Sequence, residues 1–300
     1  MSTTAWFDGF DSHRITTSGA EIFVRTGGTP GRPALLLLHG FPQTHALWHR
    51  VAQQLAGDYQ LVLPDLRGYG DSSLAPGAPQ HANYSKRAMA QDIAEVMTAL
   101  GHERFYLCGH DRGGRVAHRL ALDHADRVLK LCVIDIAPTL DMYDRTDMAF
   151  ARAYYHWFHL IQPSPLPERM IHGCWRDYLH AKLGGWGSAG LSHIEPLALA
   201  EYERCFSRPQ AIHTACEDYR ASAGIDLEHD RESRARGEKM ACDTLVIWGA
   251  NGVVNRLFEP LALWQAQCAA TVTGQAVPAG HFIPEELPAE TTQALFNFMR

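Results

Sequence analysis

A short glycine-flanked segment holds the residue best placed to do chemistry. The apolar run 105–108 stops at Gly109, and Asp111 stands midway between Gly109 and Gly113. This spacing is typical of a tight strand-to-helix turn that presents a nucleophile, where Ser is the usual residue. A carboxylate that attacks an sp3 carbon forms an ester that water can cleave. Asp111 therefore predicts alkyl transfer followed by hydrolysis, although an Asp at this place could instead cap the following helix.

A nucleophile of this kind needs a base and an acid, which follow it along the chain in the order acid and then His. His281 comes directly after the last expected strand, and none of the other His residues among the 17 lies there. We expect it to activate water, because a near-neutral imidazole can accept the proton. The alternative is an ordinary surface His.

The acid must be chosen between two strand ends. The strand at 245–249 is followed by Ala250-Asn251-Gly252, which has no carboxylate, whereas Asp135 follows the preceding strand. Asp135 could orient the imidazole and stabilise its charged form. It could also be no more than a cap at the end of its strand.

Backbone amides near the nucleophile could stabilise an oxyanion. The apolar run 34–38 ends at His39-Gly40-Phe41-Pro42. In the α/β-hydrolase pattern, the loop after this strand and the residue after the nucleophile each donate one N–H. Phe41 and Arg112 are the expected donors, although the first loop also reads as an ordinary turn.

Two arginines suggest an anionic substrate. Arg112 and Arg115 follow Asp111 by one and four positions, so both can reach the turn. Arg suits bidentate binding of a carboxylate, which would place the leaving group on the alpha carbon. Alternatively, Arg115 forms a structural salt bridge and Arg112 contributes only its N–H.

Three polar aromatic residues could receive a leaving halide. His156 and Trp157 are adjacent, and Tyr219 lies on a later expected helix. Their ring N–H and O–H groups can bind an anion without being charged, which would lower the barrier to displacement. On spacing alone, aromatic residues of this kind are more often packing residues than ligands.

The elements that must position these residues alternate in type. Expected strands end just before each proposed site residue of the core, which predicts an α/β fold with a mostly parallel central sheet flanked by helices. The alternation lapses over 137–239, where helical stretches are rich in Tyr, Trp and His. We expect a core domain from 1–136 and 240–300, and an inserted helical cap domain from 137–239. Strands are expected at 34–38, 59–64, 105–108, 129–134, 244–248 and 271–277, an opening hairpin at 13–25, and late helices at 257–268 and 289–299.

Composition limits the class of protein. The 300 residues are 46% hydrophobic, enough for a sizeable core, and the net charge of -6 predicts no general affinity for nucleic acid or membrane. Seven scattered Cys predict free, buried thiols in a reducing cytoplasm. We also expect no signal peptide and no membrane span.

Together these segments resemble the fluoroacetate dehalogenase (haloacetate dehalogenase) family of α/β-hydrolases over nearly the whole chain. The resemblance implies hydrolysis of a 2-haloacid such as fluoroacetate to glycolate and halide, in a cytoplasmic homodimer without metal or organic cofactor. It also implies a role for each candidate: Asp111 as nucleophile, His281 as base, Asp135 as its acid, Arg112 and Arg115 on the carboxylate, and His156, Trp157 and Tyr219 around the halide.

Two other functions fit parts of the pattern. An epoxide hydrolase shares the Asp nucleophile and would use Tyr219 with Tyr154 or Tyr155 to protonate the epoxide, but it leaves Arg112 and Arg115 unexplained. A small-molecule receptor on an inactive hydrolase fold would bind without turnover. The complete set of nucleophile, acid and base argues against a receptor.

Overall fold

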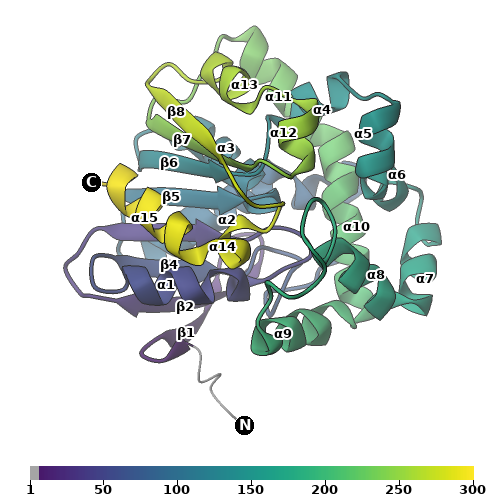
Figure 1. The fold of residues 1–300 in the computed structure, drawn as a ribbon, viewed down its shortest axis with the longest axis horizontal. Coiled ribbons are helices and arrows are strands. Elements are labelled where there is room, and N and C mark those ends of the chain that lie inside the picture. Colours follow the sequence, from purple (N-terminus) through teal and green to yellow (C-terminus); the bar gives the residue numbers. More distant parts are fainter. Residues whose placement is uncertain (1–6) are drawn as a thin grey trace.

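An eight-stranded sheet runs through the centre of the computed structural model, which describes residues 7–300 (Figure 1). The strand order is β1-β2-β4-β3-β5-β6-β7-β8, and all pairings from β4 to β8 are parallel. This confirms the expected α/β fold and the opening hairpin. The strands are β1 Asp11–Thr16, β2 Glu21–Gly28, β3 Ala34–Leu38, β4 Gln60–Pro64, β5 Phe105–His110, β6 Val128–Ile134, β7 Asp243–Gly249 and β8 Val272–Val277.

Helices cover both faces of the sheet. In Figure 1, α1 and α15 pack together in front of it, and α2 and α3 pack together behind it. Central strands covered on both sides need apolar side chains throughout, and all five residues of β3 are buried. The core helices are α1 His49–Leu55, α2 Lys86–Ala99, α3 Arg112–Asp123, α12 Val253–Leu257, α13 Pro260–Ala266, α14 Ile283–Glu286 and α15 Pro288–Phe298, with 3-10 turns at His45–Trp48 and Pro79–Tyr84.

One expected helix differs from the structure. The helix expected over 257–268 is α13, which spans Pro260–Ala266, while Leu257 ends the preceding α12. Pro260 lacks an N–H and fits the first turn of a helix, but it cannot continue one. The chain therefore breaks before it.

A series of helices lies between β6 and β7, in the segment that we expected to form a cap. Figure 1 shows most of them beside the end of the sheet to which the parallel strands point. The division into a core domain and a cap domain stays a prediction. The helices are α4 Thr139–Asp144, α5 Met148–Ala153, α6 Tyr155–Leu160, α7 Leu166–Gly173, α8 Trp175–Leu183, α9 Pro196–Phe206, α10 Pro209–Ala223 and α11 Ile225–Ala235.

Strand register brings the candidate carboxylates to one edge of the sheet. His110 pairs with Ile134, and Ile134 pairs with Ile247. The backbone N–H of Asp111 then donates to the Ile134 carbonyl at 3.2 Å, and that of Asp135 donates to the Ile247 carbonyl at 2.8 Å. The residues after β5 and β6 are thus fixed side by side.

The seven cysteines are free, as expected. Six are buried, but Cys174 is exposed, contrary to the expectation that all would be buried. Cys174 lies between α7 and α8, where the inserted helices meet solvent.

A buried carboxyl joins the core to the inserted helices. Glu285 on α14 accepts hydrogen bonds from Gln43 Nε2 at 2.6 Å and from the Tyr202 hydroxyl of α9 at 2.9 Å. Burial raises the pKa of Glu285 to about 8, because these donors and Arg50 only partly offset the loss of water. Glu285 therefore binds a proton more tightly in the folded chain than in the unfolded one.

This proton makes stability depend on pH. The usual pKa is 4.5, so the contribution of Glu285 is fully present below pH 4.5 and is lost as pH rises through 8. At about 1.4 kcal/mol per pKa unit the loss is a few kcal/mol. We predict that Glu285→Gln, which is always neutral, loses less unfolding free energy than the wild type between pH 5 and pH 9. Urea unfolding would measure this, with exposed Glu290→Gln as control. Parallel decline in the wild type and Glu285→Gln would contradict the prediction.

Candidate active site

The turn between β5 and α3 places Asp111 in a backbone conformation that few non-glycine residues adopt. Its φ is 48° and its ψ is -117°. A Cβ on Gly109 would lie 2.5 Å from the Gly113 carbonyl oxygen, and one on Gly113 would lie 2.3 Å from the His39 carbonyl oxygen. The turn thus needs glycine at both positions. The Asp111 side chain makes no capping hydrogen bond to α3, so helix capping does not explain this residue.

The loop after β3 approaches Asp111 closely. The Phe41 N–H donates to Asp111 Oδ1 at 3.0 Å, as the oxyanion expectation requires of this amide. His39 Nε2 accepts from the Leu66 N–H at 3.0 Å, so its Nδ1 carries the proton and donates to the Gly40 carbonyl, also at 3.0 Å. The neutral His39 ring thereby ties the loop after β3 to the loop after β4.

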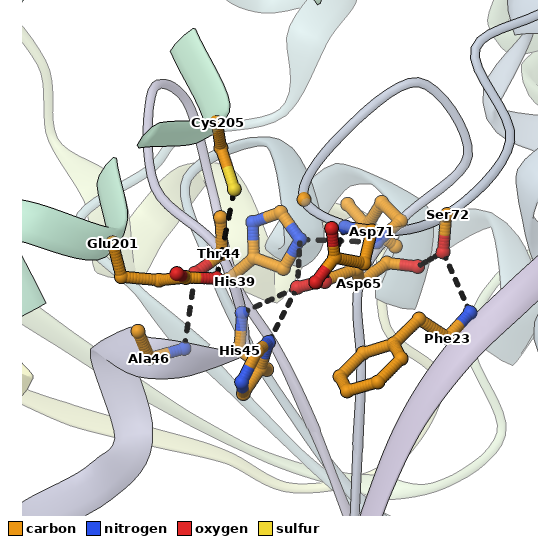
Figure 2. A network of polar contacts seen from close by, with 12 residues as sticks. Phe23, His39, Thr44, His45, Ala46, Asp65, Asp71, Ser72, Glu201 and Cys205 are labelled. Carbon is orange, nitrogen blue, oxygen red and sulfur yellow. Dashed lines mark hydrogen bonds and ion pairs between the residues drawn. The ribbon is translucent and has the colours of Figure 1, made fainter. Parts of the chain in front are cut away.

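A buried network of polar contacts supports this loop (Figure 2). Asp65, which follows β4, accepts from the His45 N–H at 2.7 Å, from His45 Nδ1 at 2.9 Å and from the Asp71 N–H at 2.8 Å. Its backbone carbonyl accepts from Ser72 Oγ at 2.6 Å. Burial alone would raise the pKa of Asp65, but the His45 ring and the hydrogen bonds from His45 outweigh it and lower the pKa to about 2. A permanent anion therefore anchors the loop.

His281 connects the two site carboxylates. Its Nδ1 lies 2.5 Å from Asp135 Oδ2, and its Nε2 lies 3.9 Å from Asp111 Oδ2. Asp135 Oδ1 accepts from the Gly249 N–H at 3.0 Å, so the carboxylate is fixed on both sides. His281 Nε2 is buried and has no hydrogen-bond partner among residues 7–300. The imidazole is thus oriented by Asp135 and offers Nε2 toward Asp111, where a water could bind.

Burial and nearby charges set the protonation states of these groups. Burial would raise the pKa of Asp111, but His281 and Arg115 outweigh it and lower the pKa below its usual value. Burial would lower the pKa of His281, but the hydrogen bond to Asp135 and the charges of Asp135 and Asp111 raise it. Asp111 is therefore an anion at neutral pH, stabilised by a basic imidazole.

His110, which the sequence analysis did not single out, holds the His281 loop. Its Nε2 donates to the His281 backbone carbonyl at 2.9 Å, and the two rings lie 4.6 Å apart. Burial, followed by the His281 charge, lowers the pKa of His110 to about 3. The ring is neutral and acts as a fixed donor. Its position beside Asp111 in the chain was the one available signal.

Arg112 is in the site but already has a carboxylate partner. Its Nε and Nη2 donate to Asp218 at 2.9 and 2.7 Å, and Nη2 also donates to Ser222 Oγ at 2.6 Å. Its guanidinium lies 4.2 Å over the Tyr219 ring. Nη1 is buried without a partner in the described part of the chain. One edge of the guanidinium is therefore tied down and the other is free to bind.

Arg115 is held without an ion pair in the part of the chain that the structure describes. Its Nη1 donates to the Ala137 carbonyl at 3.1 Å and to Thr139 Oγ1 at 3.0 Å, and its guanidinium lies 4.8 Å from the Trp157 ring. Nε is buried and unpartnered within residues 7–300. The alternative in which Arg115 forms a structural salt bridge is thus not what the structure has; Arg112 forms one instead.

The three expected halide donors come together next to the Phe41 ring. The rings of His156 and Tyr219 are 5.5 Å apart, those of Trp157 and Tyr219 are 6.4 Å apart, and Phe41 lies 5.3 Å from Tyr219. Burial lowers the pKa of His156 well below its usual value, so the ring is neutral. Helices α6 and α10 thus bring aromatic donors from distant parts of the sequence to one place.

Trp186 closes the site from the side of His281. It lies in the loop after α8 with φ of 56°, and its ring is 5.1 Å from that of His281 and 4.7 Å from that of His156. Only 8% of Asp111 is exposed. A cavity of about 390 Å³ lies elsewhere among the inserted helices and is lined by Tyr155, His159, Met170, Ile171, Cys174 and Tyr178. The candidate site is thus largely closed to solvent.

No group of three or more His, Cys, Asp or Glu side chains in 7–300 could hold a metal ion. Within the same range, no helix is long and apolar enough to cross a membrane.

Comparisons with known proteins agree with the geometry. A sequence model of the alpha/beta hydrolase fold family matches residues 33–288. A fluoroacetate dehalogenase from Burkholderia sp is 45% identical over 293 residues, which cover 98% of this chain and 95% of that protein.

More distant and structural relatives extend this picture. A soluble epoxide hydrolase from Corynebacterium sp. (strain C12) is 31% identical, over 95% of this chain and 96% of that protein. A crystal structure from Nostoc sp PCC 7120, described as an alpha/beta hydrolase, is 52% identical with a TM-score of 0.94 and covers 98% of this chain and 99% of its own.

Proposed function

This chain belongs to the fluoroacetate dehalogenase family of α/β-hydrolases, and we propose that it hydrolyses 2-haloacids through an ester on Asp111. The overall reaction converts a haloacetate such as fluoroacetate and one water into glycolate and hydrogen halide. The Burkholderia relative is named for this activity and is more similar to the chain than the relatives named as epoxide hydrolases.

The observation that carries the proposal is a pair of arginines beside a buried carboxylate, each with one buried nitrogen that lacks a hydrogen-bond acceptor. Arg112 Nη1 and Arg115 Nε are buried and have no acceptor in 7–300, and both arginines help to lower the pKa of Asp111. A buried donor without a partner costs about 1–3 kcal/mol, more when charged. A carboxylate is the acceptor that guanidinium groups bind best. A carboxylate bound there places its alpha carbon beside Asp111.

In the first step Asp111 displaces the halide. Phe41 N–H holds Oδ1, which leaves Oδ2 to attack the alpha carbon. The Oδ2–carbon bond forms while the carbon–halogen bond breaks, and its electron pair leaves with the halide. His156, Trp157 and Tyr219 stand where the halide departs, and donors aimed at developing charge lower the barrier.

In the second step His281 activates water. Esterification removes the charge of Asp111, which is one of the charges that raise the pKa of His281. The imidazole pKa then falls toward neutrality when a base is needed. Water adds to the Asp111 carbonyl carbon and gives its proton to Nε2, while Asp135 stabilises the imidazolium. The Phe41 and Arg112 amides hold the oxyanion until the alkoxide of the 2-hydroxy acid leaves with that proton. The regenerated Asp111 carboxyl group then releases its proton, which accounts for the hydrogen halide in the overall reaction.

The epoxide hydrolase alternative finds less support. Tyr155 is 48% exposed and lines the outer cavity, so it is badly placed to protonate an epoxide at Asp111. Tyr154 is buried, and its ring packs 5.5 Å from His156 and 5.9 Å from Trp157. It remains available, with Tyr219, for that role. An epoxide would still leave Arg112 Nη1 and Arg115 Nε without an acceptor.

Halide release tests the substrate class. We predict that the wild type releases fluoride from fluoroacetate and chloride from chloroacetate, measured with an ion-selective electrode. Styrene oxide should give no diol under the same conditions. Diol formation without halide release would favour the epoxide hydrolase alternative instead.

Two variants test the covalent step. His281→Asn keeps the nucleophile but lacks the base, so we predict a stable adduct after exposure to fluoroacetate, seen by intact-protein mass spectrometry. Asp111→Asn should give no adduct and at least roughly a thousandfold lower turnover, because it lacks the nucleophile. Fluoride release by Asp111→Asn near the wild-type rate would exclude an Asp111 ester.

The pKa of His281 provides a test without turnover. It is raised by Asp135 first and by Asp111 next, so both Asp135→Asn and Asp111→Asn should lower it. We expect the larger decrease for Asp135→Asn, which also loses the hydrogen bond to Nδ1. NMR titration of the imidazole would measure the three values, with exposed Asp58→Asn as control. An unchanged pKa in Asp111→Asn would refute the proposed coupling between esterification and the base.

A further inference from the structure

A buried carboxylate on α10 stands behind Arg112 and is shared by several donors. Asp218 accepts from Arg112 Nε and Nη2, from the Tyr69 hydroxyl at 2.5 Å and from Lys86 Nζ. Its backbone carbonyl accepts from Arg112 Nη2 at 2.9 Å. Burial would raise the pKa of Asp218, but Arg112 and Lys86 outweigh it and hold the pKa far below its usual range. Asp218 is thus a permanent anion that binds the Nε and Nη2 edge of the Arg112 guanidinium.

Lys86 is the second cation of this group. It is the first residue of α2, and its side chain is 5% exposed. Its Nζ pairs with Asp218 Oδ1 and lies 3.5 Å from Asp226 Oδ2, while its backbone N–H donates to Asp226 Oδ1 at 2.7 Å. Burial, followed by the charge of Arg112, lowers the pKa of the amine below its usual value, and Asp218 and Asp226 oppose this shift. The Lys86 amine is thus held between two carboxylates.

Asp218 has two opposing effects on carboxylate binding: it orients Arg112, and its negative charge repels the substrate. Asp218 orients the guanidinium so that Nη1 remains free. However, a bidentate arginine–carboxylate pair has little net charge, and the repulsion from Asp218 offsets part of the attraction of Arg112 for a second carboxylate. A further cation on Asp218 weakens that repulsion. Lys86 Nζ supplies one, since it pairs with Asp218 Oδ1, the oxygen that also accepts from Arg112 Nη2, and it lies 3.5 Å from Asp226 Oδ2.

We propose that Lys86 is a positioning and specificity-determining residue for carboxylate substrates, because it neutralises Asp218 and so leaves the oriented Arg112 with net positive charge toward the site. This inference rests on the proposed role of Arg112 in binding the substrate carboxylate. Lys86 acts through Asp218 and Arg112 and is not assigned any contact with substrate.

The test compares an anion with its neutral analogue. Acetate and acetamide have nearly the same shape, so a purely structural role for Lys86 would weaken both as competitive inhibitors. A charge role predicts that Lys86→Met weakens acetate roughly tenfold and changes acetamide less than twofold. With fluoroacetate as substrate, KM should rise by a similar factor while kcat changes much less. Lys239→Met, which removes an exposed positive charge, is the matched control.

A second variant covers the case in which Lys86→Met folds poorly, since that change leaves Asp218 without its lysine. In Lys86→Met/Asp218→Asn both charges are gone, and the Asn oxygen can still accept from Arg112. We expect acetate affinity to recover at least partly in this double variant. No recovery in a folded double variant, or equal weakening of acetate and acetamide in the single variant, would overturn the inference.

Failure of the proposed function can be told apart from failure of the inference about Lys86. A wild type that releases no halide from any haloacetate would rule out the proposed reaction. Ligand-observed NMR with acetate and acetamide would still measure how Lys86 affects carboxylate binding. A wild type that releases halide, with KM unchanged in folded Lys86→Met, would contradict this inference alone.

Discussion

The left-handed backbone at Asp111 is the constraint on which the rest of the structure depends. A non-glycine residue in such a conformation costs about 1–3 kcal/mol and persists only when its surroundings over-determine it. Here the Asp111 N–H donates to the end of β6 and its side chain accepts from Phe41, while Gly109 and Gly113 let the chain pass without a clash. The turn projects the carboxylate beyond the sheet edge, where side chains from the inserted helices and from the loop of His281 can reach it.

Burial then decides which charges the site can hold. A carboxylate as enclosed as Asp111 would favour its neutral form, and it stays ionised because His281 and Arg115 lower its pKa. The same rule applies one layer further out, where Asp218 stays ionised between Arg112 and Lys86. Each anion is flanked by cations, and Arg112, Arg115 and His281 each keep one buried nitrogen without a hydrogen-bond partner among residues 7–300. A site of this kind attracts an anion without needing a net positive protein, which agrees with an overall charge of -6.

The sequence predicted what depends on local pattern. Continuous apolar runs marked the buried strands, and the glycines around Asp111 marked the turn, because both signals lie within a few neighbouring residues. It could not predict that Arg112 is bound by Asp218, since the two are 106 positions apart and meet only when α10 packs over the turn. His156, Trp157 and Tyr219 could be named from a family resemblance, but their meeting depends on how α6 and α10 pack. The unexpected break before Pro260 shows the limit of apolar periodicity where a local backbone constraint competes with it.

Charge distinguishes the arginines from the aromatic donors of the proposed site, and under the proposed function this difference would orient the substrate. A haloacetate has a charged end and a weakly polar carbon–halogen end, and a site with cations alone would bind its carboxylate either way round. In the structure the two kinds of donor adjoin, because Arg112 lies 4.2 Å from the Tyr219 ring and Arg115 lies 4.8 Å from the Trp157 ring. Burial, together with the charge of Lys182, keeps the pKa of His156 well below its usual value, so that ring does not compete for the carboxylate. In the proposed complex the carboxylate would pair with Arg112 and Arg115, and the carbon–halogen bond would face donors that become useful only as charge develops on the halide.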